Sequence, residues 1–236
     1  MLRTRTYGSS GPLVFVLHGG PGAPGHMAPV ARGLADSFRV SEPFQRGSGD
    51  QPLTVARHVA DLHQLIEALA GAERPALVGS SWGAMLALAY AAEHPVSCDR
   101  LVLIGCGTFD LAARAQLRAT LDERNAGKVA PYSYDPVQED PKIEPYDPRA
   151  HEETWSDMLR LQEAGVYPAA FSKIKAPVLM LHGAFDPHPG RMIRDGLLPV
   201  IPQLEYREWE RCGHFPWLEK AVRDEFFVLL RGWLRV

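Results

Sequence analysis

Gly79-Ser80-Ser81-Trp82-Gly83 is the stretch that determines the fold expected for this chain. It follows an apolar run at residues 76–78 and precedes a helix-like run of small residues at 84–92. A Gly-x-Ser-x-Gly motif between a strand and a helix is typical of a sharp turn that exposes the central serine above a sheet. Its glycines avoid collision with nearby backbone, and its serine is held in a strained conformation. The pattern predicts that Ser81 is a nucleophile.

Two further residues complete a triad in the chain order that this motif requires, which is Ser, then Asp or Glu, then His. Asp186 follows an apolar strand at residues 177–181, and His214 lies in a loop after the strand-like residues 204–209. A serine hydroxyl is a poor nucleophile without a base, so His214 is expected to take its proton. Asp186 is expected to hold the imidazole in the required tautomer.

Asp110 is an alternative to Asp186 as the acid of the triad, because it follows the strand expected at residues 101–104. We favour Asp186 because residues 183–187 form a turn-like Gly-Ala-Phe-Asp-Pro stretch directly after their strand.

An acyl transfer also needs hydrogen-bond donors aimed at the developing oxyanion. One donor is expected from the backbone N–H of Trp82, at the start of the helix that follows the serine. The second is expected from the loop His18-Gly19-Gly20-Pro21-Gly22, whose glycines allow the backbone to approach a substrate closely. We predict the Gly20 N–H as this donor, with Gly19 as the second choice.

Strand-like and helix-like patterns alternate along most of the chain, which predicts an α/β fold with a mostly parallel sheet that helices cover on both faces. The expected strands are residues 1–7, 13–17, 39–44, 76–78, 101–104, 177–181 and 204–208. Thr54 and Gly71 are residue types that favour the start and the end of a helix. The apolar stripe of this helix is Val55, Val59, Leu62, Ile66 and Leu69.

Residues 106–173 interrupt the alternation, because no strong strand pattern occurs there. A Pro-rich, acidic stretch at 128–149 lies between two helix-like stretches at 111–125 and 150–165. We predict that 106–173 form a short helical cap over the site and that 1–105 and 174–236 form the core. A disordered loop is the alternative, but the tyrosines and helices of this segment offer more apolar surface than a disordered linker usually has.

Aromatic residues of these regions are the candidate pocket residues. They are Phe44, Tyr132, Tyr134 and Phe215. His182, Asp186 and His188 are residue types that bind metals, but nothing else in the sequence completes a metal site. Since the triad explains Asp186 better, no metal or cofactor is expected.

The composition limits the classes of partner. The chain has 236 residues and a net charge of −3, without the basic block expected of a nucleic-acid-binding protein. No apolar run approaches the roughly 20 residues that span a bilayer, and the first residues do not resemble a signal peptide. The three cysteines show no metal-binding or redox spacing. We expect a cytoplasmic protein that acts on a small molecule or a short peptide; the sequence leaves its oligomeric state open.

Three motifs give the chain a resemblance to the α/β-hydrolase superfamily, and within it to the proline iminopeptidase group. They are His18-Gly19-Gly20-Pro21-Gly22, Gln45-Arg46-Gly47-Ser48-Gly49 and Gly79-Ser80-Ser81-Trp82-Gly83. The resemblance implies the α/β-hydrolase fold, a triad of Ser81, Asp186 and His214, and an oxyanion hole of Gly20 and Trp82.

The chain departs from this group in two respects. The group usually has an aspartate before its Gln-Arg-Gly, where this chain has Phe44. The group's cap is usually larger and supplies acidic residues that hold a free amino group. The acidic residues of the segment here include Glu139, Asp140, Glu144, Asp147, Glu152 and Glu153, and none of these aligns with the group's amine-binding residues.

These features favour a serine hydrolase that cleaves a small ester or amide through an acyl-enzyme intermediate. An aminopeptidase of the proline iminopeptidase type is the narrower hypothesis. A non-catalytic ligand-binding relative of the fold is the alternative from another class, although such proteins typically lack a triad member. A dehalogenase or epoxide hydrolase needs a carboxylate nucleophile, which Ser81 argues against.

Overall fold

The computed structural model describes residues 2–128, 132–137 and 145–235. In this part of the chain, seven strands form one sheet in the order β1-β3-β2-β4-β5-β6-β7. Their bounds are β1 Thr4–Tyr7, β2 Leu13–Leu17, β3 Arg39–Pro43, β4 Ala76–Ser80, β5 Leu101–Ile104, β6 Val178–Gly183 and β7 Leu204–Trp209. β1 pairs antiparallel with β3, and the other described pairs are parallel.

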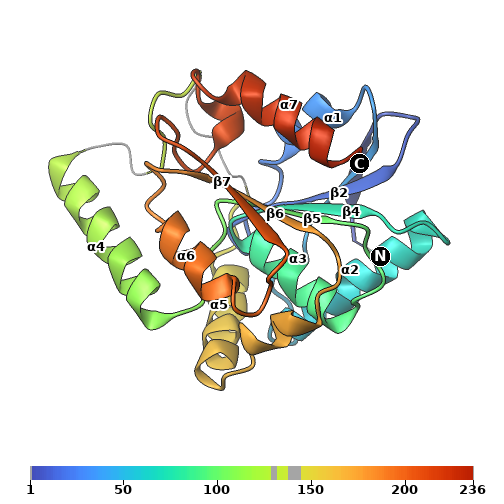
Figure 1. Ribbon diagram of the computed structural model, residues 1–236. Helices are drawn as coiled ribbons and strands as arrows, with labels where there is room; N and C mark the ends of the chain where they lie inside the picture. Colours follow the sequence, from blue (N-terminus) through green and yellow to red (C-terminus); the bar gives the residue numbers. More distant parts are fainter. Residues whose placement is uncertain (1, 129–131, 138–144, 236) are drawn as a thin grey trace.

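Helices cover both faces of the sheet (Figure 1). Helices α1 (Ala28–Leu34) and α7 (Arg223–Trp233) lie on one face, and helices α2 (Val55–Ala70), α3 (Trp82–Glu93) and α6 (Gly190–Leu197) lie on the other. Strands β2, β4, β5 and β6 are buried along their whole length, as expected of strands covered from both sides. This architecture confirms the predicted fold class. None of the described helices is long and apolar enough to span a membrane.

The segment between β5 and β6 holds helices α4 (Leu111–Gly127) and α5 (Pro148–Glu163) and the short 3-10 helix η1 (Ala169–Lys173). Helix α4 lies at the edge of the molecule (Figure 1) and buries a single residue, Ala113. Helix α5 packs against α2, and η1 packs against α3. Both helices therefore form where the sequence predicts them, and α5 lies against the main body of the fold.

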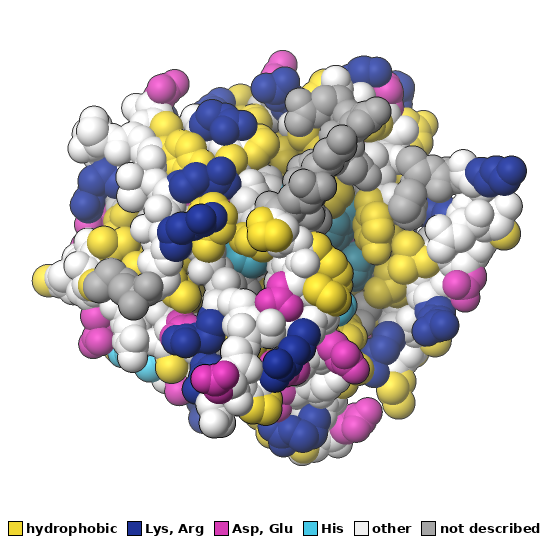
Figure 2. Space-filling view, turned by 180° about the vertical axis from the view of Figure 1, so that it is seen from behind, with side chains coloured by type: hydrophobic (Ala, Val, Ile, Leu, Met, Phe, Trp, Pro, Cys, Tyr) yellow, Lys and Arg dark blue, Asp and Glu magenta, His cyan; other side chains and the backbone are white. Residues whose placement is uncertain are grey.

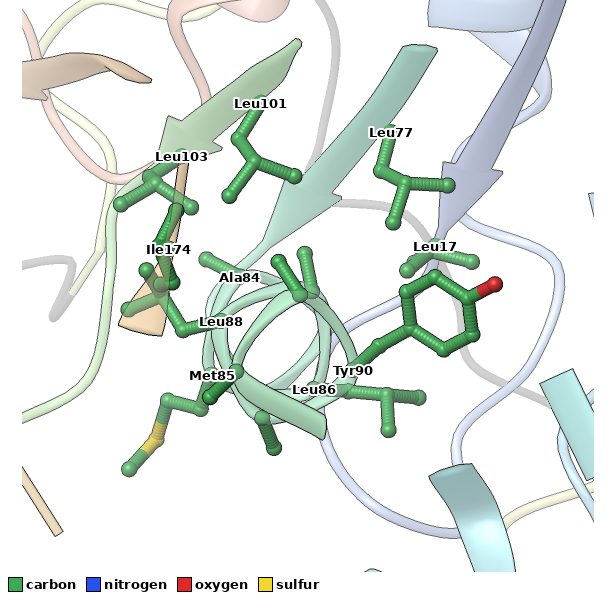
Figure 3. Close-up of a cluster of buried hydrophobic side chains, with 14 of the residues drawn as sticks. Leu17, Leu77, Ala84, Met85, Leu86, Leu88, Tyr90, Leu101, Leu103 and Ile174 are labelled. Carbon is green, nitrogen blue, oxygen red and sulfur yellow. The ribbon is translucent and has the colours of Figure 1, made fainter. Parts of the chain in front are cut away.

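Helix α3 is the centre of the core. Every residue from Trp82 to Ala92 is buried, because the helix lies between the sheet on one side and α2 and η1 on the other. Figure 3 shows the helix end-on, with Leu77 and Leu101 of the sheet above it. A helix that is hydrophobic on all sides fits this central position. The turn that bears Ser81 is therefore attached to the most tightly enclosed helix of the protein.

Helix α2 confirms the predicted cap residues but corrects one member of its apolar stripe. The Thr54 hydroxyl accepts from the Arg57 N–H over 3.2 Å, and Gly71 ends the helix with φ of 59°. Leu69, which was expected in the stripe, is 40% exposed, whereas Leu65 is 1% exposed. The last turn of the helix presents Ala70 to the core instead of Leu69.

Helix α6 was not expected from the sequence. It follows a turn that contains Pro187 and Pro189, and it buries only Gly190, Ile193 and Leu197. Such a short apolar pattern after two prolines gives little periodic signal.

The difference between Leu65 and Leu69 is testable. Leu65→Ala should lower the free energy of unfolding by about 2–5 kcal/mol, because it leaves a cavity in the core. Leu69→Ala, the matched control on the same helix, should change it by less than about 0.5 kcal/mol. Urea unfolding followed by circular dichroism measures both values. Equal losses in the two variants would contradict this packing.

Candidate active site

Ser81 occupies the turn between β4 and α3 with φ of 54° and ψ of −118°, a strained conformation for a residue other than glycine. Its N–H donates to the Ile104 carbonyl on β5 over 2.8 Å. A Cβ at Gly79 would lie 2.2 Å from the Gly83 carbonyl oxygen, and a Cβ at Gly83 would lie 2.2 Å from the Leu17 carbonyl oxygen. Both glycines are therefore required to place Ser81 at the carboxyl end of the sheet.

Asp186 and His214 meet in a buried hydrogen bond at the same end of the sheet. His214 Nδ1 donates to Asp186 Oδ2 over 2.6 Å, and both side chains are buried. Asp186 lies in the turn after β6, where its N–H donates to the Gly183 carbonyl over 3.0 Å. A Cβ at Gly105, directly after β5, would lie 2.7 Å from His214 Nδ1, so glycine leaves room for the imidazole.

The surroundings of Asp186 keep it ionised. Burial raises the pKa of the carboxyl group, but the imidazoles of His214, His182 and His188 outweigh burial and hold the pKa well below its usual value. Asp186 is therefore a hydrogen-bond acceptor at neutral pH. Because a carboxylate only accepts, the His214–Asp186 hydrogen bond requires a proton on His214 Nδ1, and Nε2 is the ring nitrogen that does not take part in it.

Ser81 and His214 line one cavity of about 450 Å³. Its described lining also includes Gly19, Gly20, Pro21, His26, Trp82, Met85, Gly107, Tyr132, His151, Trp155, His188 and Phe215. Figure 2 shows histidine side chains in a recess bordered by hydrophobic side chains. The lining combines residues that follow β2, β4, β5, β6 and β7 with His151 and Trp155 of α5.

Asp110, the alternative acid, has a different place in the structure. Its side chain caps the N-terminus of α4 and accepts from the Ala113 N–H over 2.8 Å. The hydrogen bond of His214 goes to Asp186 instead.

The loop after β2 brings Gly20 to the cavity. Gly19 is held on both sides, since its N–H donates to His26 Nε2 over 3.3 Å and its carbonyl accepts from His18 Nδ1 over 3.0 Å. Gly20 adopts φ of 48°, and its N–H has no partner among the described residues. Trp82 is the first residue of α3, so its N–H lacks an intrahelical acceptor. Two backbone donors therefore border the cavity beside Ser81.

Gln45 connects the two elements that carry these donors. Its side-chain amide donates to the His18 carbonyl over 2.8 Å and accepts from Trp82 Nε1 over 2.7 Å. Its backbone N–H donates to His18 Nε2 over 3.0 Å. Burial lowers the pKa of His18 to about 4, so the ring is neutral and can accept at Nε2. One residue thus fixes the loop after β2 relative to the start of α3.

The alpha/beta hydrolase family matches residues 13–226 of the sequence. The chain belongs to this family. It is 27% identical to the proline iminopeptidase of Lactobacillus helveticus (strain DPC 4571) over an alignment 275 positions long. The alignment covers 96% of this chain and 90% of that protein.

Solved structures show the same fold. A thermophilic esterase from Thermogutta terrifontis matches with a TM-score of 0.73 at 22% identity. The match covers 99% of this chain and 93% of the esterase chain. A serine hydrolase involved in carbazole degradation, CarC, matches with a TM-score of 0.73 at 20% identity. The match covers 99% of this chain and 94% of the CarC chain.

The structure brings two of the four predicted pocket residues of this alpha/beta hydrolase to the cavity. Tyr132 and Phe215 line it. Phe44 lies outside the described lining, and the guanidinium groups of Arg3 and Arg5 lie over its ring, 4.1 and 4.9 Å from the ring centre.

Tyr134 is also outside the described lining of the cavity. Its ring packs edge-on against Phe185, with ring centres 5.4 Å apart, and it is 46% exposed. Its backbone N–H donates to Glu219, which turns this part of the segment toward the loop that bears His214.

The acidic residues around α5 hold the helix to the core. Three carboxylates accept backbone N–H groups of residues 48–55, the stretch that leads into α2. The pairs are Asp147 with Ser48 (2.8 Å), Glu153 with Leu53 (2.9 Å) and Asp157 with Val55 (2.8 Å). Glu139, Asp140 and Glu144 lie outside the described residues. The described lining of the cavity contains no carboxylate.

Glu219 is a structural residue of the site that sequence reasoning missed. This fully buried carboxylate accepts three backbone N–H groups, from Tyr134 (2.8 Å), Asp135 (2.7 Å) and Gly213 (2.8 Å). The His214 N–H donates to the Tyr132 carbonyl over 2.7 Å. The loop that bears His214 is thereby joined to the segment between β5 and β6. A Glu at this position in the sequence shows no motif from which such a role could be read.

Asp186, His188 and His214 also bring possible metal-ligand atoms within 4.8 Å of one another. Both histidines donate ring protons to Asp186, His188 over 2.9 Å and His214 over 2.6 Å. Hydrogen bonding within the group therefore accounts for the cluster without an ion.

The bridging role of Gln45 predicts a kinetic effect. Gln45→Leu should lower kcat about tenfold or more with a smaller change in KM, because the two donors lose their common support while the cavity wall stays in place. Gln51→Leu, a change at an exposed position of the same loop, is the control and should have wild-type kinetics. Steady-state assays with a p-nitrophenyl ester measure both. A change confined to KM would contradict the role in donor placement.

Proposed function

We propose that this protein is a serine hydrolase in which Ser81, His214 and Asp186 form the catalytic triad. The observation that carries the proposal is the buried His214–Asp186 hydrogen bond beside a cavity that Ser81 also lines. The strained turn at Ser81 supports it, because such a turn is the usual way in which this fold presents a nucleophile.

In the proposed reaction, His214 Nε2 takes the proton of Ser81 as its Oγ attacks the carbonyl carbon of the substrate. The negative charge that develops on the carbonyl oxygen is stabilised by the N–H groups of Gly20 and Trp82. His214 then gives the proton to the leaving alcohol or amine, and an acyl-enzyme ester forms on Ser81. Water, activated by the same imidazole, releases the acid and restores the serine.

The proposed substrate is a small ester or amide with a largely apolar acyl group. Trp82, Met85, Trp155 and Phe215 supply apolar surface around Ser81. A cavity of about 450 Å³ fits a small molecule or the end of a short peptide. We further propose that residues 106–173 act as a cap and that the protein works in the cytoplasm without a cofactor or metal.

A narrower candidate is an aminopeptidase of the proline iminopeptidase type. The similarity to the Lactobacillus helveticus enzyme favours it, since it extends over 96% of this chain. Against it stands the use of Asp147, Glu153 and Asp157 to hold backbone N–H groups, which leaves these carboxylates unsuited to a substrate ammonium. A non-catalytic binding protein is less well supported, because the sequence has a serine, an aspartate and a histidine at the three proposed triad positions.

Substitution of the two candidate acids tests the triad. Asp186→Asn should lower kcat by about 10³-fold or more, because an amide cannot stabilise the His214 imidazolium or enforce its tautomer. Asp110→Asn should leave kcat within about twofold, since asparagine also caps a helix well. Steady-state kinetics on both variants decide between them, and the reverse ranking would move the acid to Asp110.

The preference between an ester and a prolyl amide tests which acyl group the enzyme accepts. The enzyme should turn over a short-chain p-nitrophenyl ester with a higher kcat/KM than L-proline p-nitroanilide, because no carboxylate of the described lining is available to bind the prolyl amine. N-acetylation of the prolyl substrate is the control and should not reduce turnover. A strong preference for the free prolyl amine, lost on acetylation, would establish the aminopeptidase instead.

A further inference from the structure

Asp186 accepts from two imidazole rings. His214 Nδ1 donates to Oδ2 over 2.6 Å, while His188 Nδ1 donates to Oδ1 over 2.9 Å. The backbone N–H of His188 also donates to Oδ1, over 2.9 Å. The proposed triad needs only the first of these contacts, so the role of the His188 ring is unassigned.

We propose that His188 is a positioning residue that acts on His214 through Asp186. This inference rests on the proposed triad. The two donors of His188 hold Oδ1, and a carboxylate fixed at one oxygen cannot turn its other oxygen away from His214. Oδ2 is thereby kept in line with His214 Nδ1 throughout the reaction, including the step in which His214 carries a positive charge.

The two rings also restrain each other directly. The His188 and His214 rings are stacked, with centres 4.8 Å apart and planes inclined by 20°. Phe215 meets His214 edge-on from another direction, at 4.9 Å and 75°. The His214 ring therefore has one stacked aromatic neighbour and one steeply inclined aromatic neighbour, which limits the orientations that it can adopt.

His182 fixes the backbone of His188 in turn. Its Nε2 donates to the His188 carbonyl over 3.0 Å and lies 3.3 Å from Asp186 Oδ2. Burial lowers the pKa of His182, so the ring is neutral and holds this proton at Nε2. A Cβ at Gly190 would lie 2.5 Å from the His182 ring, which shows how closely α6 packs on this histidine. The turn from β6 to α6 is thus built around the carboxylate, and His188 belongs to that support.

His188→Asn and His188→Leu form a matched pair for the test. The two side chains are similar in size, and asparagine keeps an N–H donor close to the place of Nδ1, whereas leucine has none. His188→Leu should lower kcat for a p-nitrophenyl ester about tenfold with KM within about twofold. His188→Asn should retain kcat within about threefold of the wild type. If His188→Leu fails to fold, His188→Phe replaces it, because phenylalanine keeps the stacking and removes the donor.

The Asp186→Asn background shows whether His188 acts through the carboxylate. There, His188→Leu should change the residual kcat by less than about twofold, because the group on which it acts is gone. An undiminished tenfold effect in this background, a wild-type kcat in His188→Leu, or an effect confined to KM would each overturn the proposal; the last would make His188 a substrate contact.

A spectroscopic measurement separates this proposal from the proposed function. Proton NMR should show a downfield Nδ1–H signal of His214, assigned by its loss in His214→Gln. His188→Leu should shift this signal, and His188→Asn should restore its position. These expected shifts of the His214 signal do not depend on which reaction the site performs. An unmoved signal in His188→Leu would overturn the positioning role, whereas full activity in Asp186→Asn would overturn the triad alone.

Discussion

The close approach of the Ser81 turn to strand β2 is the constraint on which the rest of the site depends. Gly83 leaves no space for a side chain beside the Leu17 carbonyl, and Gly19 leaves little beside Ser81 itself. The loop after β2 and the start of α3 are therefore forced together at the carboxyl end of the sheet. Gly20 and Trp82, whose N–H groups are the proposed oxyanion donors, therefore line the same cavity as Ser81.

The strain at Ser81 is sustained by the burial of α3. A residue in this conformation costs on the order of 1–3 kcal/mol, and it persists only where the surroundings over-determine it. Here the helix that follows is enclosed by the sheet, α2 and η1. The hydrogen bonds of Gln45 to His18 and Trp82 add a polar connection across the same junction. The packing of the core around α3 thus also holds the proposed nucleophile in place.

Several acidic residues of this chain join separate segments by accepting backbone N–H groups, a role that their positions in the sequence did not reveal. Asp147, Glu153 and Asp157 hold α5 against residues 48–55, and the buried Glu219 joins residues 134–135 to the loop of His214. These contacts satisfy backbone N–H groups that would otherwise lack partners. They also fix the wall of the cavity formed by His151 and Trp155 of α5 relative to Ser81.

The sequence predicted the parts of the molecule that depend on local pattern. The glycines around Ser81, the order of the strands along the chain and the cap residues Thr54 and Gly71 follow from short-range sterics and periodicity. The burial of Leu69 was predicted wrongly, because it depends on which way one side chain turns in the last turn of a helix. The bridging role of Gln45 and the role of Glu219 were not predicted, because Gln45 meets Trp82 37 residues away along the chain and Glu219 meets Tyr134 85 residues away.

The central claim is that Ser81 is an activated nucleophile, and covalent labelling tests it most directly. The protein would be treated with a fluorophosphonate, digested and analysed by tandem mass spectrometry, with Ser80→Ala and Ser81→Ala as the matched pair of neighbouring variants. The account predicts a single adduct on Ser81 that persists in Ser80→Ala and disappears in Ser81→Ala. No adduct in the wild type, or an adduct that survives in Ser81→Ala, would contradict it.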